Sequence, residues 1–100
     1  LLFLHGTVLQ NLSRYHEAKE VFSTILQYNP NDIAALNSLG HLELSDNQFD
    51  AALECFSQVL KRDSFKHDAR ENKVKILLVK NEYEKALADL NFLLDAGHHS

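Results

Sequence analysis

Apolar residues follow helical spacing along the chain, and the whole pattern repeats. When the sequence is shifted against itself by 34 residues, side chains of similar size coincide from one end to the other. The coinciding sets are Gly6 with Gly40, Tyr15 with Phe49 and Tyr83, Ala18 with Ala52 and Ala86, Phe22 with Phe56 and Leu90, and Leu26 with Leu60 and Leu94. This repeat predicts three copies of one structural unit.

Each unit divides into two helical segments joined by a short polar turn, at residues 11–14, 45–48 and 80–82. Asp32 follows Pro30 and is expected to cap the first helix of the middle unit, because its carboxylate can accept a hydrogen bond from a free N–H of the first turn. Asp63 or Ser64 is expected to cap the third unit, and Ala96 with Gly97 to end the last helix. The units are therefore predicted to be helical hairpins.

Small and large residues alternate where the helices are expected to meet. Gly6 and Gly40, and the alanine set, allow close approach of two helices. The aromatic residues opposite them are expected to fill the remaining space. Tyr15, Phe49 and Tyr83 are expected to pack beside the turns, and Phe22, Phe56 and Leu90 to bridge to the neighbouring helix.

Composition narrows the class of protein. With 45% hydrophobic and 24% charged residues, the 100-residue chain has the balance of one globular domain, and its one Pro and three Gly are too few for an all-β fold. A net charge of −4 gives little attraction to phosphates, so no nucleic acid partner is expected. The apolar opening at residues 1–4 is too short to enter a membrane as a span. A soluble, cytoplasmic chain is favoured, and the lack of an initiating Met suggests a fragment of a longer protein.

No catalytic, cofactor-binding or metal-binding site is predicted, so the chain is not expected to be an enzyme. The single Cys55 excludes an intrachain disulfide and a Cys-rich zinc site, and nothing in the sequence places a histidine beside it as a base. His16 and Glu20 have the i, i+4 spacing of metal ligands, but two ligands do not make a site. No function is assigned to His98 and His99, and there is no glycine-rich phosphate loop.

The pattern resembles the tetratricopeptide repeat (TPR) family over nearly the whole chain. The resemblance rests on the small residues Gly6 and Gly40, the two aromatic sets, the alanine set and Pro30. It implies an all-α fold: a single domain, 1–100, of three tandem helix-turn-helix hairpins near 1–31, 32–66 and 67–100, wound into a right-handed superhelix (α-solenoid). The third unit departs most, because Val74 stands at the small position, Arg70 and Lys73 at apolar positions and His98 where proline is common. Its first helix is expected to be rotated, frayed or exposed.

In this family the first helix of each repeat lines a concave groove, and the resemblance carries that role onto this sequence. The implied partner-binding residues are Phe3, Thr7, Gln10 and Asn11 from the first unit, Asn37, His41, Leu44 and Ser45 from the second, and Glu71, Lys75, Leu78 and Val79 from the third. Asn37 and His41 are expected to hydrogen-bond a partner, or else to form a solvated helix face. Leu44, Leu78 and Val79 are candidate apolar anchors, although Leu44 and Leu78 also suit packing between helices.

Two charge patterns refine the expected partner. The family members that bind chaperone C-terminal tails grip a terminal carboxylate with a set of basic and amide side chains. Here that set corresponds to Phe3, Thr7, Ser38, Asp68 and Asn72, which include no cation, so such a tail is not expected. The mixed-sign run at 63–75 is interpreted as a solubilising helix face, with charge recognition at one end of the groove as the alternative.

The sequence thus predicts a non-enzymatic protein–protein interaction module that binds a peptide segment or partner protein and scaffolds a complex. One alternative is a structural spacer or a self-association segment that uses the apolar ends, since Leu87, Leu90, Phe92, Leu93 and Leu94 give the last helix apolar residues on more than one side. Another is the substrate-recruiting arm of a larger enzyme. Partner identity and compartment are not specified by a repeat scaffold.

Overall fold

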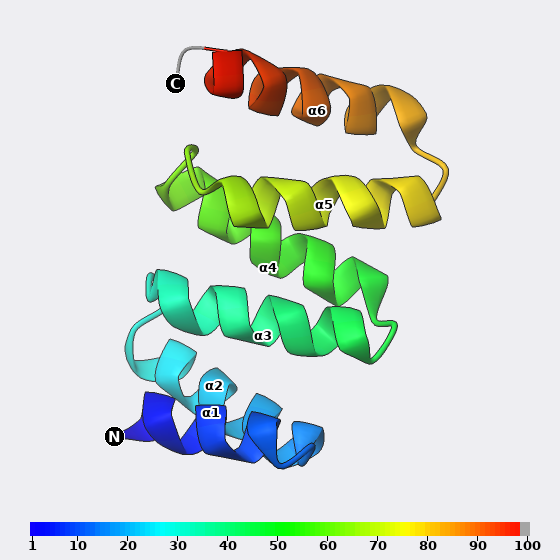
Figure 1. Cartoon of the computed structure of the whole chain (residues 1–100). Helices are drawn as coiled ribbons and strands as arrows, with labels where there is room; N and C mark the ends of the chain where they lie inside the picture. The colour runs from blue at the N-terminus through cyan, green and yellow to red at the C-terminus, as the bar shows by residue number, and fades with distance from the viewer. Residues whose placement is uncertain (99–100) are drawn as a thin grey trace.

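Six helices make up the part of the chain that the computed structural model describes, residues 1–98. They are α1 (Leu2–Asn11), α2 (Tyr15–Tyr28), α3 (Ile33–Ser45), α4 (Phe49–Arg62), α5 (His67–Val79) and α6 (Tyr83–His98). Consecutive helices pair as hairpins, and α2 packs on α3 and α4 on α5 to join one hairpin to the next. Figure 1 shows the hairpins stacked one over another, with α1, α3 and α5 lying above each other. The all-α solenoid of three hairpins is confirmed.

Helix starts and ends follow the sequence pattern only in part. Asp32 caps α3 as predicted, its Oδ1 accepting a hydrogen bond from the Ala35 amide at 3.1 Å. The prediction of a cap by Asp63 or Ser64 is wrong, because α5 begins after Lys66, which makes no side-chain cap. Asp63 instead accepts a hydrogen bond from the Phe65 amide at 3.1 Å inside the loop. The last helix also does not end at Ala96 and Gly97 but continues to His98; His99 lies outside the described residues.

The turn inside each hairpin has the same backbone geometry. Ser13, Asn47 and Asn81, spaced by the repeat period, have φ values of 62°, 59° and 61°. Directly after them, the amides of Arg14, Gln48 and Glu82 donate to the carbonyls of Leu9, Glu43 and Leu77 at 2.9, 2.8 and 2.8 Å. These bonds satisfy carbonyls that the helix end leaves free, as in a Schellman motif. Asn tolerates this left-handed conformation better than Ser, so Ser13 is the strained member of the set.

The core of the first two hairpins is a phenylalanine seated on a glycine. Phe22 and Phe56 are fully buried. A Cβ built on Gly6 would lie 2.8 Å from Phe22 Cζ, and one built on Gly40 would lie 2.9 Å from Phe56 Cε1, closer than real contacts allow. Only glycine therefore fits beneath these rings.

The third hairpin lacks this pair and is packed differently. Buried Val74 takes the glycine position, and Leu90, at the phenylalanine position, is 41% exposed, so the prediction that Leu90 bridges to a neighbouring helix is wrong. Tyr15 and Tyr83 are also exposed, and Tyr83 contacts its turn through its hydroxyl, which donates to Asn81 Oδ1 at 2.7 Å, whereas Phe49 packs against the central cluster. The first helix of this hairpin is nevertheless regular: α5 is continuous and buries Ala69, Ile76 and Leu77.

We expect Ser13→Asn to stabilise the protein by about 0.5–1 kcal/mol, because it relieves part of the cost of a left-handed Ser. Asn47→Ala should cost about 1 kcal/mol for the converse reason. Urea unfolding followed by circular dichroism measures both. Ser23→Asn on the exposed face of α2 is the control and should give no gain; an equal gain there would contradict the turn explanation.

A second prediction concerns the seat of Phe56. Gly40→Ala should destabilise the wild-type protein by about 1 kcal/mol, since overpacking against the fully buried ring outweighs the better helix propensity of Ala. In a Phe56→Leu background, the same change should become stabilising by up to about 1 kcal/mol, because the smaller side chain leaves room. The double-mutant cycle is read from urea unfolding. An identical effect of Gly40→Ala in both backgrounds would rule out this packing.

Candidate functional site

The residues predicted to line the groove all lie on the stacked first helices α1, α3 and α5 (Figure 1). None of them is buried in the core. They alternate with core positions along each helix: His41 is partly exposed while its neighbour Leu42 is buried, and exposed Lys75 precedes buried Ile76. A rotation of about 100° per residue turns one neighbour to the core and the other away from it.

On this surface, α3 and α5 form a small polar pocket that is open to solvent. The cavity has a volume of about 180 Å³ and is lined by His41, Asp68, Glu71 and Asn72. His41 is held in place from two sides, by an edge-on contact with the Phe56 ring at 5.5 Å between centroids and by Asn72, whose Nδ2 lies 3.5 Å from His41 Nε2. The pocket is therefore built on the same buried phenylalanine that organises the middle hairpin.

Sequence reasoning found half of this pocket. His41 and Glu71 belong to the predicted groove set, whereas Asp68 and Asn72 do not. The available signal was their spacing, because residues 68, 71 and 72 are i, i+3 and i+4 on one face of α5. Asn37, one turn before His41, has a buried Oδ1 with no hydrogen-bond partner among the described residues.

Several other predicted groove residues already have partners inside the protein. Phe3 packs edge-on against Phe22 with 5.5 Å between ring centroids. The Thr7 hydroxyl donates to the Phe3 carbonyl at 2.9 Å, and Leu44 packs on the central hydrophobic cluster. By contrast, Leu78 and Val79 are 48% and 56% exposed. At the end of α1, Gln10 is partly exposed and Asn11 is exposed, so side chains that can contact a partner lie on all three first helices.

A second, apolar cavity lies at the other end of the stack. It has a volume of about 460 Å³ and is formed by the start of α1, the end of α2 and Asp32. The lining residues are Leu1, Leu2, Phe3, Ile25, Tyr28, Asn29 and Asp32. Apart from Phe3, these residues were not in the predicted groove set. The cavity offers an apolar contact surface and no reactive group.

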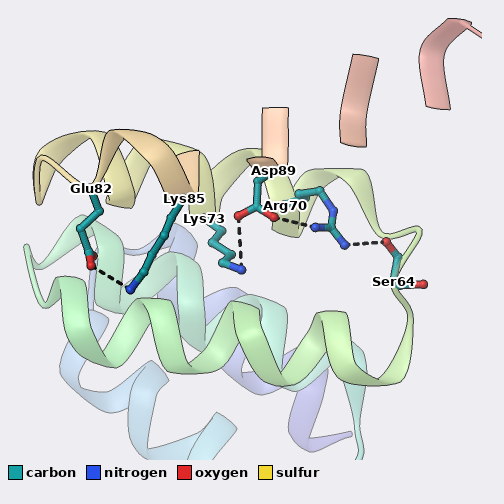
Figure 2. A network of polar contacts seen from close by, with 6 residues as sticks. All are labelled: Ser64, Arg70, Lys73, Glu82, Lys85 and Asp89. Atoms are coloured by element: carbon teal, nitrogen blue, oxygen red, sulfur yellow. Dashed lines mark hydrogen bonds and ion pairs between the residues drawn. The ribbon is translucent and has the colours of Figure 1, made fainter. Parts of the chain in front are cut away.

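Two cations of the mixed-sign run, Arg70 and Lys73, form ion pairs between α5 and α6 (Figure 2). Arg70 pairs with Asp89 at 2.6 Å, Lys73 reaches the same carboxylate at 3.2 Å, and both members of the first pair are largely buried. Arg70 also donates to the Ser64 carbonyl at 3.1 Å and lies 3.9 Å from the centroid of the Phe92 ring. In the repeat register, Arg70 and Asp89 take the places of Leu36 and Cys55. This ion pair therefore occupies positions that are apolar in the middle hairpin, and it links α5 to α6 beside the cluster of Val74, Leu77 and Ala86.

Further ion pairs tie one hairpin to the next. Lys19 on α2 contacts Glu43 at 3.2 Å and Asp46 at 2.8 Å. The hydrogen bond to Asp46 raises the pKa of Lys19, and the same bond lowers the pKa of Asp46. At the next junction Lys80 pairs with Asp50, and this hydrogen bond raises the pKa of Lys80. These charges fix the ends of the stacked helices rather than a ligand.

Cys55 is poorly suited to act as a catalytic nucleophile. Cys55 is buried in α4, and the resulting desolvation of the thiolate raises the pKa of its thiol to about 11. The thiol is therefore protonated near neutral pH and weakly nucleophilic. Within residues 1–98, no group of three or more His, Cys, Asp or Glu side chains is arranged to hold a metal ion. No helix in that part of the chain has the length and apolar character needed to cross a membrane.

Two family models described as tetratricopeptide repeat match the sequence, one over residues 37–97 and one over residues 1–32. The chain belongs to the tetratricopeptide repeat family. No curated protein sequence matches it significantly.

Solved structures share the fold over almost the full chain. The Yersinia enterocolitica type III secretion translocator chaperone SycD superposes with a TM-score of 0.84 and 21% identity, over 89% of this chain and 61% of that one. MamA from Desulfovibrio magneticus RS-1 superposes with a TM-score of 0.89 and 17% identity, over 99% of this chain and 56% of that one. YrrB is described as a TPR protein with an unusual peptide-binding site. It superposes with a TM-score of 0.83 and 29% identity, over 94% of this chain and 48% of that one. The chain thus spans 48–61% of the length of these three proteins.

A prediction follows for the buried ion pair. Asp89→Ala should destabilise the protein by about 3 kcal/mol, because it leaves the Arg70 guanidinium buried without its carboxylate. The repeat places Leu36 at the position of Arg70 and Val21 at the position of Asp89. The double variant Arg70→Leu with Asp89→Val should therefore be neutral or stabilising by about 1 kcal/mol or more. Urea unfolding compares the variants. A double variant as unstable as Asp89→Ala would show that the apolar contact cannot replace the pair.

Proposed function

We propose that this chain is a non-enzymatic protein–protein interaction module whose groove, formed by α1, α3 and α5, binds an extended segment of a partner protein. The observation that carries the proposal is the polar pocket between α3 and α5, in which His41 is held by Phe56 and Asn72. Stacked hairpins bury their shared faces and leave the first helices free to contact a ligand. Binding such a segment would bring the partner and the rest of an assembly together as a scaffold.

The accessible chemistry of the groove suits an extended peptide. Asn37 and His41 are partly exposed polar residues of α3, and the exposed Leu78 and Val79 are apolar anchors about two turns from Glu71. Polar groups in a mostly preformed groove fix the register of a peptide, while apolar side chains add binding energy. Both kinds of contact lie on α3 and α5.

Family membership and two structural relatives support a protein partner. YrrB is described as having a peptide-binding site, and the CopN–Scc3 complex, at 19% identity and a TM-score of 0.85 over 90% of this chain and 53% of that one, contains a related fold in a complex. We do not propose a chaperone C-terminal tail as the ligand. The positions for its carboxylate hold Phe3, Thr7, Ser38, Asp68 and Asn72, none of which is cationic.

Self-association is a second candidate that one observation favours. Leu87, Leu90 and Leu94 are exposed along α6. They correspond in the repeat to Leu53, Phe56 and Leu60 of α4, which lie in the cluster that packs against α5. A second copy could cover this face in the same way as α5 covers α4.

The groove is tested by affinity capture from a lysate of the source organism. We expect a partner that is retained by the wild-type protein and lost, by about tenfold or more, with Asn37→Ala combined with His41→Gln, since two directional hydrogen-bonding groups are removed. Gln preserves most of the volume beside Phe56, and an unchanged thermal melt confirms folding.

Glu20→Ala combined with Ser23→Ala on the exposed face of α2 is the matched control, and this variant should retain the partner. Equal capture by both variants would place recognition outside the groove. If no partner is captured and the molecular mass rises with protein concentration, self-association replaces the groove as the function.

A further inference from the structure

The pocket between α3 and α5 presents hydrogen-bond acceptors. Asp68 and Glu71 contribute carboxylates, which only accept when ionised. The Asn72 Nδ2 group faces His41 Nε2, and because an amide nitrogen only donates, this ring nitrogen is the acceptor. The two carboxylates give the pocket a negative charge, so it is matched to a cationic ligand that donates.

Asn72 provides evidence beyond the two carboxylates. Its side chain lines the cavity and is only 8% exposed. Within the described residues, its carboxamide has one partner, the long 3.5 Å contact with His41, and its Oδ1 accepts no hydrogen bond. This oxygen is therefore available to accept a hydrogen bond from a ligand N–H placed in the pocket.

The charges around the pocket favour a cation. Arg70 and Lys73, on the same helix, are committed to Asp89 and do not neutralise the pocket. Lys75 lies 3.8 Å from Glu71, but both side chains are exposed, so this pair is weak. The N-terminus of α5 contributes about half a positive charge at most, against two carboxylates.

Size and geometry then select among cations. A volume of about 180 Å³ corresponds to about six water molecules, enough for the end of one side chain. Asp68, Glu71 and the Oδ1 of Asn72 offer three acceptor groups on one helical face, which suits the three N–H donors of an ammonium group.

We propose that this pocket binds the ammonium group of a lysine side chain in the partner segment. The proposal rests on the proposed function, because it names the residue that the groove would select. Asp68 and Glu71 supply the opposite charge, and Asn72 accepts the third hydrogen bond. His41 keeps the Asn72 amide oriented.

The test is an NMR titration of the ¹⁵N-labelled protein with Nα-acetyl-lysine methylamide, a probe without a free N-terminus. We expect saturable shifts centred on the amides of His41, Asp68, Glu71 and Asn72. The Nε-acetylated probe, which lacks the charge, should give no saturable shift, and the arginine analogue should bind more weakly. A free peptide N-terminus presents the same ammonium chemistry, so alanine methylamide is titrated as well and should bind more weakly than the lysine probe, because it lacks the long side chain.

Variants connect the shifts to the carboxylates. Asp68→Asn combined with Glu71→Gln should weaken binding about tenfold or more, because two charge-assisted hydrogen bonds are lost. Glu71→Gln alone should weaken it less and leaves the first turn of α5 intact. Glu20→Gln combined with Glu84→Gln makes the same change in net charge elsewhere and should have no effect, and Lys75→Gln should tighten binding about twofold.

Shifts that do not saturate, or that fall equally in the control variant, overturn the proposal. Equal binding of the arginine or alanine probe overturns the selection of a lysine side chain. These outcomes are separate from failure of the proposed function. A groove that captures its partner without binding the lysine probe rejects only the lysine pocket, whereas probe binding without any groove-dependent capture rejects the interaction module.

Discussion

The close seat of Phe22 on Gly6 and of Phe56 on Gly40 is the contact on which the first two hairpins depend. A Cβ at either glycine would meet the ring at under 3 Å, so these rings reach the backbone of the partner helix. The approach brings the two helices of a hairpin close enough for the alanines of the second helix to be fully buried. The same phenylalanine also supports the groove, because His41 rests edge-on against Phe56. Core packing and the candidate site therefore share one side chain.

The third hairpin meets the same constraint with different chemistry, and this difference shapes the site. Val74 and Leu90 replace the glycine and the phenylalanine, and the ion pair of Arg70 with Asp89 adds a buried polar contact between α5 and α6. As a result, Arg70 and Lys73 are drawn toward α6, while Asp68 and Glu71 line the pocket and Lys75 lies 3.8 Å from Glu71. Besides its exposed charges, the mixed-sign run thus supplies the largely buried Arg70 of an ion pair.

The repeat period of 34 residues predicted most of the architecture, because size and helical spacing are local properties that recur. It predicted six helices in three hairpins and placed the turns within a residue of their observed positions. The prediction that Asp63 or Ser64 caps α5 failed because the path of the loop decides which residue precedes the first turn of the helix. In this protein that residue is Lys66. Tyr15, Tyr83 and Leu90 were predicted to pack because their equivalents do. Whether such a side chain is buried depends on which helix lies next to it, and the sequence of a single repeat does not specify that helix.

The site was less predictable than the fold for a related reason. The groove set followed from helix register, which places a residue on a face but does not say which other helix lies opposite. Asn72 corresponds in the repeat to Ser38 and Leu4, yet Leu4 is exposed and Asn72 is buried beside His41. That environment exists because α4 packs against both α3 and α5 and so places α5 beside α3. Stacking thus creates the pocket from residues on two repeats, while the core positions next to them, such as Leu42 and Ile76, stay buried. Because adjacent positions of one helix divide between core and groove, the ligand chemistry of the groove can vary without disturbing the packing that forms it.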